Sequence, residues 1–135
     1  MKHGIILTHG PIGVAMIEAV RGIVGIDEGL HALSVTNMSV DEITQRLRAI
    51  VNGPEEKQEG AIIMASLKGG SCWNVAVAVA KDHPKVKVLS GVNLPMVLSF
   101  VMKRESMTID ELICELENDG LKGITKLETE LRPGI

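Results

Sequence analysis

The chain has 135 residues, of which 45% are hydrophobic and 23% are charged, and its formal net charge is -3. This size and composition fit one globular domain over residues 1–135 and exclude a disordered or fibrous chain. Only 1% of the residues are aromatic, which argues against single-stranded nucleic-acid binding, because such proteins stack bases on aromatic rings. The negative charge also argues against binding a phosphate backbone. We therefore expect no nucleic-acid partner and an aliphatic core, which is typical of parallel sheets.

The sequence offers no targeting or membrane-spanning signal. No stretch is apolar over the roughly 18 residues that a membrane helix needs, and the apolar run near the start is too short for a signal peptide. Cys72 and Cys114 lie far apart and form no CxxC motif, so we expect neither a disulfide framework nor a zinc site. These features predict a cytoplasmic protein with no metal and no cofactor.

The first half of the chain alternates between short apolar runs and helical spacing. Residues 4–8 predict a buried strand. A helix follows, for which Pro11 suits the first turn and Gly25 the end. Its expected buried stripe consists of Ile12, Ala15, Met16, Ala19, Val20 and Ile23. Residues 30–36 predict a second strand, and a Ser–Glu capping box at 39–42 opens a helix over residues 40–51.

The second half continues the same alternation. Residues 60–66 predict a third strand, and the run at 75–80 fits either period. We interpret this run as a helix beginning at Ser71, because a second consecutive strand would need a hairpin and neither face of the run is polar. Residues 86–90 predict the fourth strand, followed by a helix to about Lys103. A second capping box at 108–111 opens a helix that we expect to stop at Asp119-Gly120.

Strands that alternate with helices predict an α/β fold with a mainly parallel sheet buried between helices. The tail at 124–131 alternates loosely and fits either a strand or a frayed helix, which leaves an extra C-terminal edge strand as one of two alternatives. In α/β folds of this kind, ligands bind beyond the carboxyl ends of the strands, where the strand order reverses.

Three breaks in the pattern fall directly after predicted strands. His9 follows the first strand, residues 66–71 follow the third, and residues 90–93 follow the fourth. Parallel strands bring all three breaks to one edge of the sheet. If the first and third strands are neighbours, His9 faces the glycine-rich turn at 69–71. A helix that begins at Ser71 would then direct backbone N–H groups and the positive end of its dipole at the space above His9.

This arrangement suits a phosphoryl group carried on the imidazole of His9. Neutral imidazole is an available nucleophile near neutral pH, and Gly69 and Gly70 allow the backbone to approach a ligand closely. We expect these backbone amides, the Ser71 hydroxyl and the Lys68 ammonium to receive the phosphoryl oxygens. Taken singly, a histidine after a strand is more often an ordinary loop residue, and Gly-Gly-Ser an ordinary turn and helix cap. Their joint placement favours the phosphoryl site.

Three motifs together resemble the mannose-type enzyme IIA family of the bacterial phosphotransferase system. They are Gly4-Ile5-Ile6-Leu7-Thr8-His9-Gly10, Gly69-Gly70-Ser71 followed by Asn74-Val75-Ala76, and Gly91-Val92-Asn93-Leu94-Pro95-Met96. The resemblance covers essentially the whole chain. It implies a four-stranded parallel sheet in the order 2-1-3-4 between helix layers, which would place the first and third strands side by side.

The same resemblance implies a role and a set of partners. His9 would take a phosphoryl group from the phosphocarrier HPr and pass it to a IIB component, with the IIC and IID membrane components acting further along. The family also implies a homodimer, which can exchange a C-terminal strand that here would begin near Ile124.

The sequence departs from the family pattern beside the expected site. Ser66 stands where many members have an aspartate that orients the active histidine, and Lys68 stands where an uncharged residue is common. A serine still forms hydrogen bonds and is expected to orient His9, but it brings no charge. This departure, together with the lack of a fused IIB domain in the sequence, supports an alternative function as a regulatory module that signals to a partner. A third alternative is a small-molecule binding domain that uses the 69–71 turn without covalent chemistry.

Overall fold

The computed structural model describes residues 1–53 and 59–129. Within these ranges four parallel strands form one sheet in the order β2-β1-β3-β4, which confirms the expected topology. The strands are β1 His3–Thr8, β2 Leu30–Ser34, β3 Ala61–Ala65 and β4 Val86–Ser90. β2 ends two residues earlier than the apolar run at 30–36 predicts.

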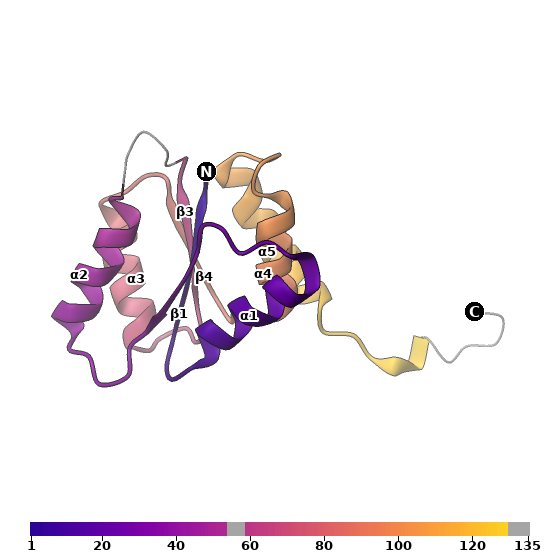
Figure 1. Ribbon diagram of the computed structural model, residues 1–135, viewed down its shortest axis with the longest axis horizontal. Helices are drawn as coiled ribbons and strands as arrows, with labels where there is room; N and C mark the ends of the chain where they lie inside the picture. Colours follow the sequence, from indigo (N-terminus) through magenta and orange to yellow (C-terminus); the bar gives the residue numbers. More distant parts are fainter. Residues whose placement is uncertain (54–58, 130–135) are drawn as a thin grey trace.

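Helices cover both faces of the sheet and complete the expected three layers (Figure 1). The helices are α1 Ile12–Val24, α2 Val40–Val51, α3 Ser71–Lys81, α4 Leu94–Lys103 and α5 Ile109–Lys122. One hydrophobic cluster lies between the sheet and the pair α2 and α3, and a second lies between the sheet and α1, α4 and α5. Because side chains alternate along a strand, Ile5 and Leu7 join the first cluster and Ile6 joins the second.

The buried face of α1 differs from the expected stripe. Ile12 and Ile23 are 47% and 59% exposed, whereas Gly13 and Val20 are buried. A Cβ atom on Gly13 would lie 3.1 Å from the Cβ of Ala32, so α1 packs closely on the sheet at this glycine. α1 therefore buries a different face from the one that its apolar residues alone indicate.

The end of α5 was also predicted wrongly. The helix does not stop at Asp119-Gly120 but continues to Lys122. Gly120 is buried, and a Cβ atom there would lie 3.1 Å from the Cε of Met96 on α4. The Asn93 side-chain amide also donates a hydrogen bond of 3.0 Å to the Gly120 carbonyl. This glycine permits close packing between helices and does not end the helix.

The tail beyond α5 extends away from the body of the molecule (Figure 1). It contains a 3-10 turn at Leu127–Thr129 and, up to Thr129, no strand. The alternative of a C-terminal edge strand therefore has no counterpart within the described part of the tail. The last two residues of the 124–131 segment lie outside the described residues.

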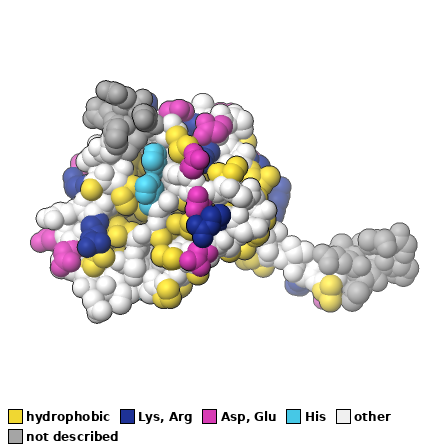
Figure 2. Space-filling model, in the orientation of Figure 1, with side chains coloured by type: hydrophobic (Ala, Val, Ile, Leu, Met, Phe, Trp, Pro, Cys, Tyr) yellow, Lys and Arg dark blue, Asp and Glu magenta, His cyan; other side chains and the backbone are white. Residues whose placement is uncertain are grey.

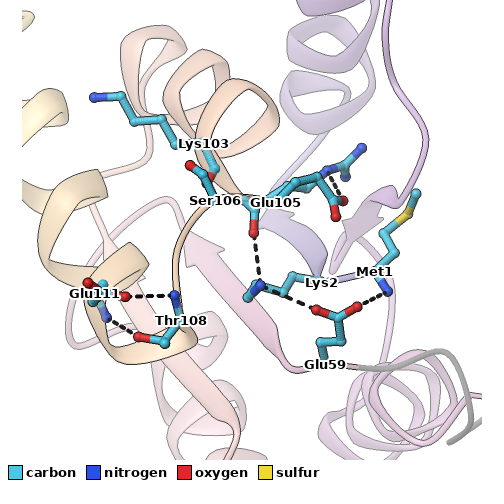
Figure 3. Close-up of polar contacts among 9 residues, drawn as sticks. Met1, Lys2, Glu59, Lys103, Glu105, Ser106, Thr108 and Glu111 are labelled. Carbon is cyan, nitrogen blue, oxygen red and sulfur yellow. Dashed lines mark hydrogen bonds and ion pairs between the residues drawn. The ribbon is translucent and has the colours of Figure 1, made fainter.

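The two expected capping boxes differ in how completely they form. At the start of α5, Thr108 Oγ1 accepts a hydrogen bond from the Glu111 amide, and the Thr108 amide donates to Glu111 Oε1 (Figure 3). At the start of α2, Ser39 Oγ accepts from the Glu42 amide, but the Glu42 carboxylate accepts from the Ser39 hydroxyl and not from its amide. The reciprocal backbone bond is therefore present only at Thr108.

Thr108→Ala should lower the free energy of unfolding by about 1 kcal/mol, because it leaves the Glu111 amide in the first turn of α5 without its side-chain acceptor. Thr108→Ser should keep most of the stability, since serine retains the hydroxyl. Urea unfolding followed by circular dichroism measures both values. Equal stability of the serine and alanine variants would contradict the capping role.

Charged groups surround a buried lysine at the amino end of the sheet (Figure 3). Lys2 is 6% exposed. Its ammonium donates a hydrogen bond of 2.8 Å to the Arg104 carbonyl and lies 3.5 Å from Glu59 Oε2. The terminal amine of Met1 pairs with the other oxygen of Glu59 at 3.1 Å. The buried ammonium is thus satisfied by a carbonyl and a carboxylate, as buried charges require.

Two histidines pack against each other near the same end of the sheet. His3 Nδ1 lies 2.8 Å from His31 Nε2, and the two rings stack with centroids 5.1 Å apart. Burial lowers the pKa of both rings, and the positive terminal amine adds to this effect at His3. Both rings therefore favour the neutral state in the folded protein.

The free energy of unfolding should fall as the pH decreases below about 6.5, because the unfolded chain gains protons at these histidines before the folded protein does. His31→Phe should make this dependence shallower, since it removes one of the two groups. Urea unfolding at several pH values between about 5 and 8 measures the slope. An unchanged slope in the variant would show that the pair does not carry the pH dependence.

Candidate functional site

The loops that follow β1, β3 and β4 meet at the carboxyl edge of the sheet, as expected. β1 and β3 are neighbours, with Leu7 opposite Ala65. Backbone hydrogen bonds continue this pairing past the strand ends: the Ser66 amide donates to the Leu7 carbonyl at 3.1 Å, and the Val92 amide donates to the Ala65 carbonyl at 3.1 Å. These bonds hold the loops after β1, β3 and β4 beside one another at the predicted site.

His9 is exposed and lies directly after β1. Behind it, Gly10 adopts a φ of 60°, and its amide donates a hydrogen bond of 2.8 Å to Thr36 Oγ1 in the loop after β2. This bond connects the loop between β1 and α1 to the loop after β2. The imidazole therefore projects from an anchored backbone, with a ring that solvent and a partner protein can reach.

The amino terminus of α3 lies beside His9. The helix begins at Ser71, as predicted, and no side chain caps it. Gly69 reaches the turn with a φ of 87°, a left-handed conformation that favours glycine. Gly69, Gly70 and Ser71 are all exposed. The first-turn amides of an uncapped helix form a positive end that attracts anions.

One direct contact joins the histidine to this helix. Nδ1 of His9 lies 4.0 Å from Sγ of Cys72, the second residue of α3. Cys72 is 2% exposed and belongs to the hydrophobic cluster under α3. Burial raises the pKa of its thiol, and hydrogen bonding from Ser66 and from the Cys72 amide partly opposes this rise. The thiol is therefore neutral at physiological pH.

None of the ion pairs in the described part of the chain involves His9. The described residues contain no cluster of three or more His, Cys, Asp or Glu side chains that could hold a metal ion. No described helix is long and apolar enough to cross a membrane. On the face shown in Figure 2, basic and acidic side chains are interspersed.

Comparison with known proteins places this geometry in a family. A family model described as the PTS system fructose IIA component matches residues 4–117. The chain belongs to the mannose-type enzyme IIA family. It is thus related to the components of bacterial sugar phosphotransferase systems, whose general role is phosphoryl transfer.

Individual relatives agree with this assignment. The sorbose-specific EIIA component of Klebsiella pneumoniae is 28% identical over 117 residues, which cover 87% of this chain and 85% of that protein. The mannose-specific EIIAB component of Escherichia coli K12 is 23% identical over 128 residues, and the match spans only 39% of its length. The crystal structure of an EIIA component from Streptococcus agalactiae superposes with a TM-score of 0.86 at 25% identity, covering 96% of this chain and 99% of that one.

In this enzyme IIA, the structure brings together some of the sequence-predicted site residues. The contact between His9 and Cys72 places His9 beside the turn at 69–71, at one edge of the sheet. Ser66 is half-buried, and no hydrogen bond joins it to His9 among the described residues. Lys68 is exposed and lines, with Trp73, a cavity of about 440 Å³ beside the end of β4. In the sheet order, β3 separates that strand from β1.

Sequence reasoning did not place Cys72 at the site. It is buried, but it also contacts the ring of His9. The helical period contained the signal: with α3 starting at Ser71, the apolar positions Val75, Ala76 and Val79 define the inward face, and Cys72 lies one turn before them. A first-turn residue on the inward face of α3 therefore points toward the carboxyl edge of the sheet, where His9 lies.

Proposed function

We propose that His9 is the phosphoryl acceptor of this enzyme IIA. In the proposed reaction a ring nitrogen of His9 attacks the phosphorus atom of phospho-HPr. The bond between phosphorus and the donor breaks as the new N–P bond forms. A IIB component then attacks the same phosphorus, and its bond to His9 breaks in turn. The protein is proposed to act as a single-domain carrier in the cytoplasm.

The position of His9 at the uncapped amino terminus of α3 carries this proposal. An exposed imidazole is joined through Cys72 to the helix whose first-turn amides attract anions. Phosphoryl transfer depends mainly on positioning and on stabilising negative oxygens, and these amides can do both. We propose that the backbone at Gly69 and Gly70 and the Ser71 hydroxyl bind the phosphoryl oxygens. Lys68 is proposed to add positive charge at the rim.

The test is incubation of the full chain with phosphoenolpyruvate, enzyme I and HPr, followed by measurement of the intact mass. We expect the addition of one phosphoryl group that acid removes, because phosphohistidine is acid-labile. A known enzyme IIA serves as the positive control. No mass gain in this protein, while the control gains one group, would contradict the proposal.

A regulatory role is the second candidate, and one observation favours it. None of the ion pairs among the described residues joins a carboxylate to His9, and serine occupies position 66. A phosphoryl group on His9 would then serve as a signal to a partner instead of an intermediate in sugar import. Incubation of the phosphorylated protein with a IIB component separates the two roles: rapid transfer supports the carrier, and retention of the group supports regulation.

We further propose that the protein works as a homodimer beside the IIC and IID membrane components. Three observations support a dimer: β4 is an edge strand, Ile124 and Leu127 in the tail are 81% and 61% exposed, and Ile124 helps line the cavity beside β4. An exposed apolar residue beside an edge strand, as Ile124 is beside β4, is typical of an interface. Light scattering that gives a monomer mass at all concentrations would contradict this proposal.

A further inference from the structure

We propose that Cys72 is the positioning residue for His9. The Cys72 sulfur accepts a hydrogen bond from Nδ1–H of His9. This bond leaves the lone pair of Nε2 free to attack phosphorus. The inference rests on the proposed function of His9, but it concerns a contact that exists before any phosphoryl group arrives.

The contact lies where a positioning group is needed. The 4.0 Å separation between Sγ and Nδ1 is the one hydrogen-bonding contact of the His9 ring among the described residues. His9 itself is exposed, so the surrounding protein restricts its ring little elsewhere. Cys72, by contrast, is 2% exposed and packed in the cluster that includes Leu7 and Ala65. A sulfur held by the core can therefore fix one edge of the exposed ring.

The chemistry of the sulfur determines what this positioning can do. A ring nitrogen that carries hydrogen has no free lone pair, so a hydrogen bond from Nδ1–H selects Nε2 as the nucleophile. The neutral thiol is a weak acceptor and brings no negative charge to His9. It therefore orients the ring and selects its tautomer without the electrostatic stabilisation of an imidazolium that a carboxylate provides.

The test measures the tautomer of His9 by proton–nitrogen NMR in the unphosphorylated full chain. We expect the Nδ1–H form in the wild-type protein and a shift toward the Nε2–H form in Cys72→Ala. The rate of phosphorylation by phospho-HPr should fall about two- to tenfold in this variant, which is the size of effect that a weak neutral hydrogen bond provides. Cys72→Ser should restore part of the Nδ1–H preference and part of the phosphorylation rate, because a hydroxyl also accepts a hydrogen bond.

Val75→Ala is the matched control for packing. Val75 is 3% exposed and lies one turn further along α3 in the same cluster. This variant should lose stability without changing the His9 tautomer. An unchanged tautomer and an unchanged rate in Cys72→Ala would overturn the proposal for Cys72.

These tautomer measurements require no phosphorylation. A protein that shows the predicted tautomers but accepts no phosphoryl group would therefore refute the proposed function and leave the positioning contact established.

Discussion

His9→Gln should abolish phosphoryl uptake and leave the fold intact. Glutamine is polar and of similar reach, but it has no ring nitrogen that can form an N–P bond. Because His9 is exposed, the free energy of unfolding should change by no more than about 0.5 kcal/mol. Intact mass after incubation with phosphoenolpyruvate, enzyme I and HPr should show one phosphoryl group on the wild-type protein and none on the variant.

The matched control is His83→Gln. His83 precedes β4 and therefore lies at the opposite edge of the parallel sheet, where Nε2 of its ring is 2.6 Å from Asn52 Oδ1. This variant should still accept one group, because its ring is far from the amino terminus of α3. Full phosphorylation of the His9 variant, or loss of phosphorylation in both variants, would contradict the assignment of the acceptor.

Phe100→Ala should cause the largest loss of stability among single core substitutions on α4. The ring is fully buried in the cluster under α1, α4 and α5. It packs so closely on β1 that a Cβ atom on Gly4 would lie 2.9 Å from Phe100 Cε2. Truncation removes this contact and leaves a cavity, which costs about 3–5 kcal/mol. That is a large part of the roughly 5–15 kcal/mol by which a domain is stable.

Urea unfolding measures this loss as a lower midpoint with an unchanged slope. Met102→Ala is the control on the same helix, because Met102 is 70% exposed and its truncation should change the stability by no more than about 0.5 kcal/mol. If both variants lost the same stability, the effect would reflect the helix propensity of α4 and not the packing of Phe100.

Several features of the fold follow from local sequence patterns. The strands at 4–8 and 86–90 are short apolar runs, and the helix ends at Gly25 and Thr108 have the residues that such ends require. Gly25 adopts a φ of 75°, and Thr108 forms a complete capping box. These patterns depend on a few neighbouring residues, so the sequence is enough to recognise them.

Two glycines show where local patterns fail. Gly13 lies on the buried face of α1, and Gly120 lies inside α5 against Met96. A count of apolar residues gives a glycine no weight on a buried face, and a glycine near a helix end is usually taken as a stop signal. In both positions the absence of a side chain serves close packing between elements that are distant in the sequence, which only the assembled structure reveals.

For the candidate site, the sequence alone placed His9 and the turn at 69–71 after neighbouring strands, because the carboxyl ends of parallel strands share one edge. It did not show which side chain contacts the histidine. Ser66 was expected to orient His9, whereas the contact on Nδ1 comes from Cys72. Which inward-facing side chain reaches the ring depends on how α3 docks on the sheet. That docking results from packing Cys72, Val75 and Val79 against the strands, so only the tertiary structure decides it.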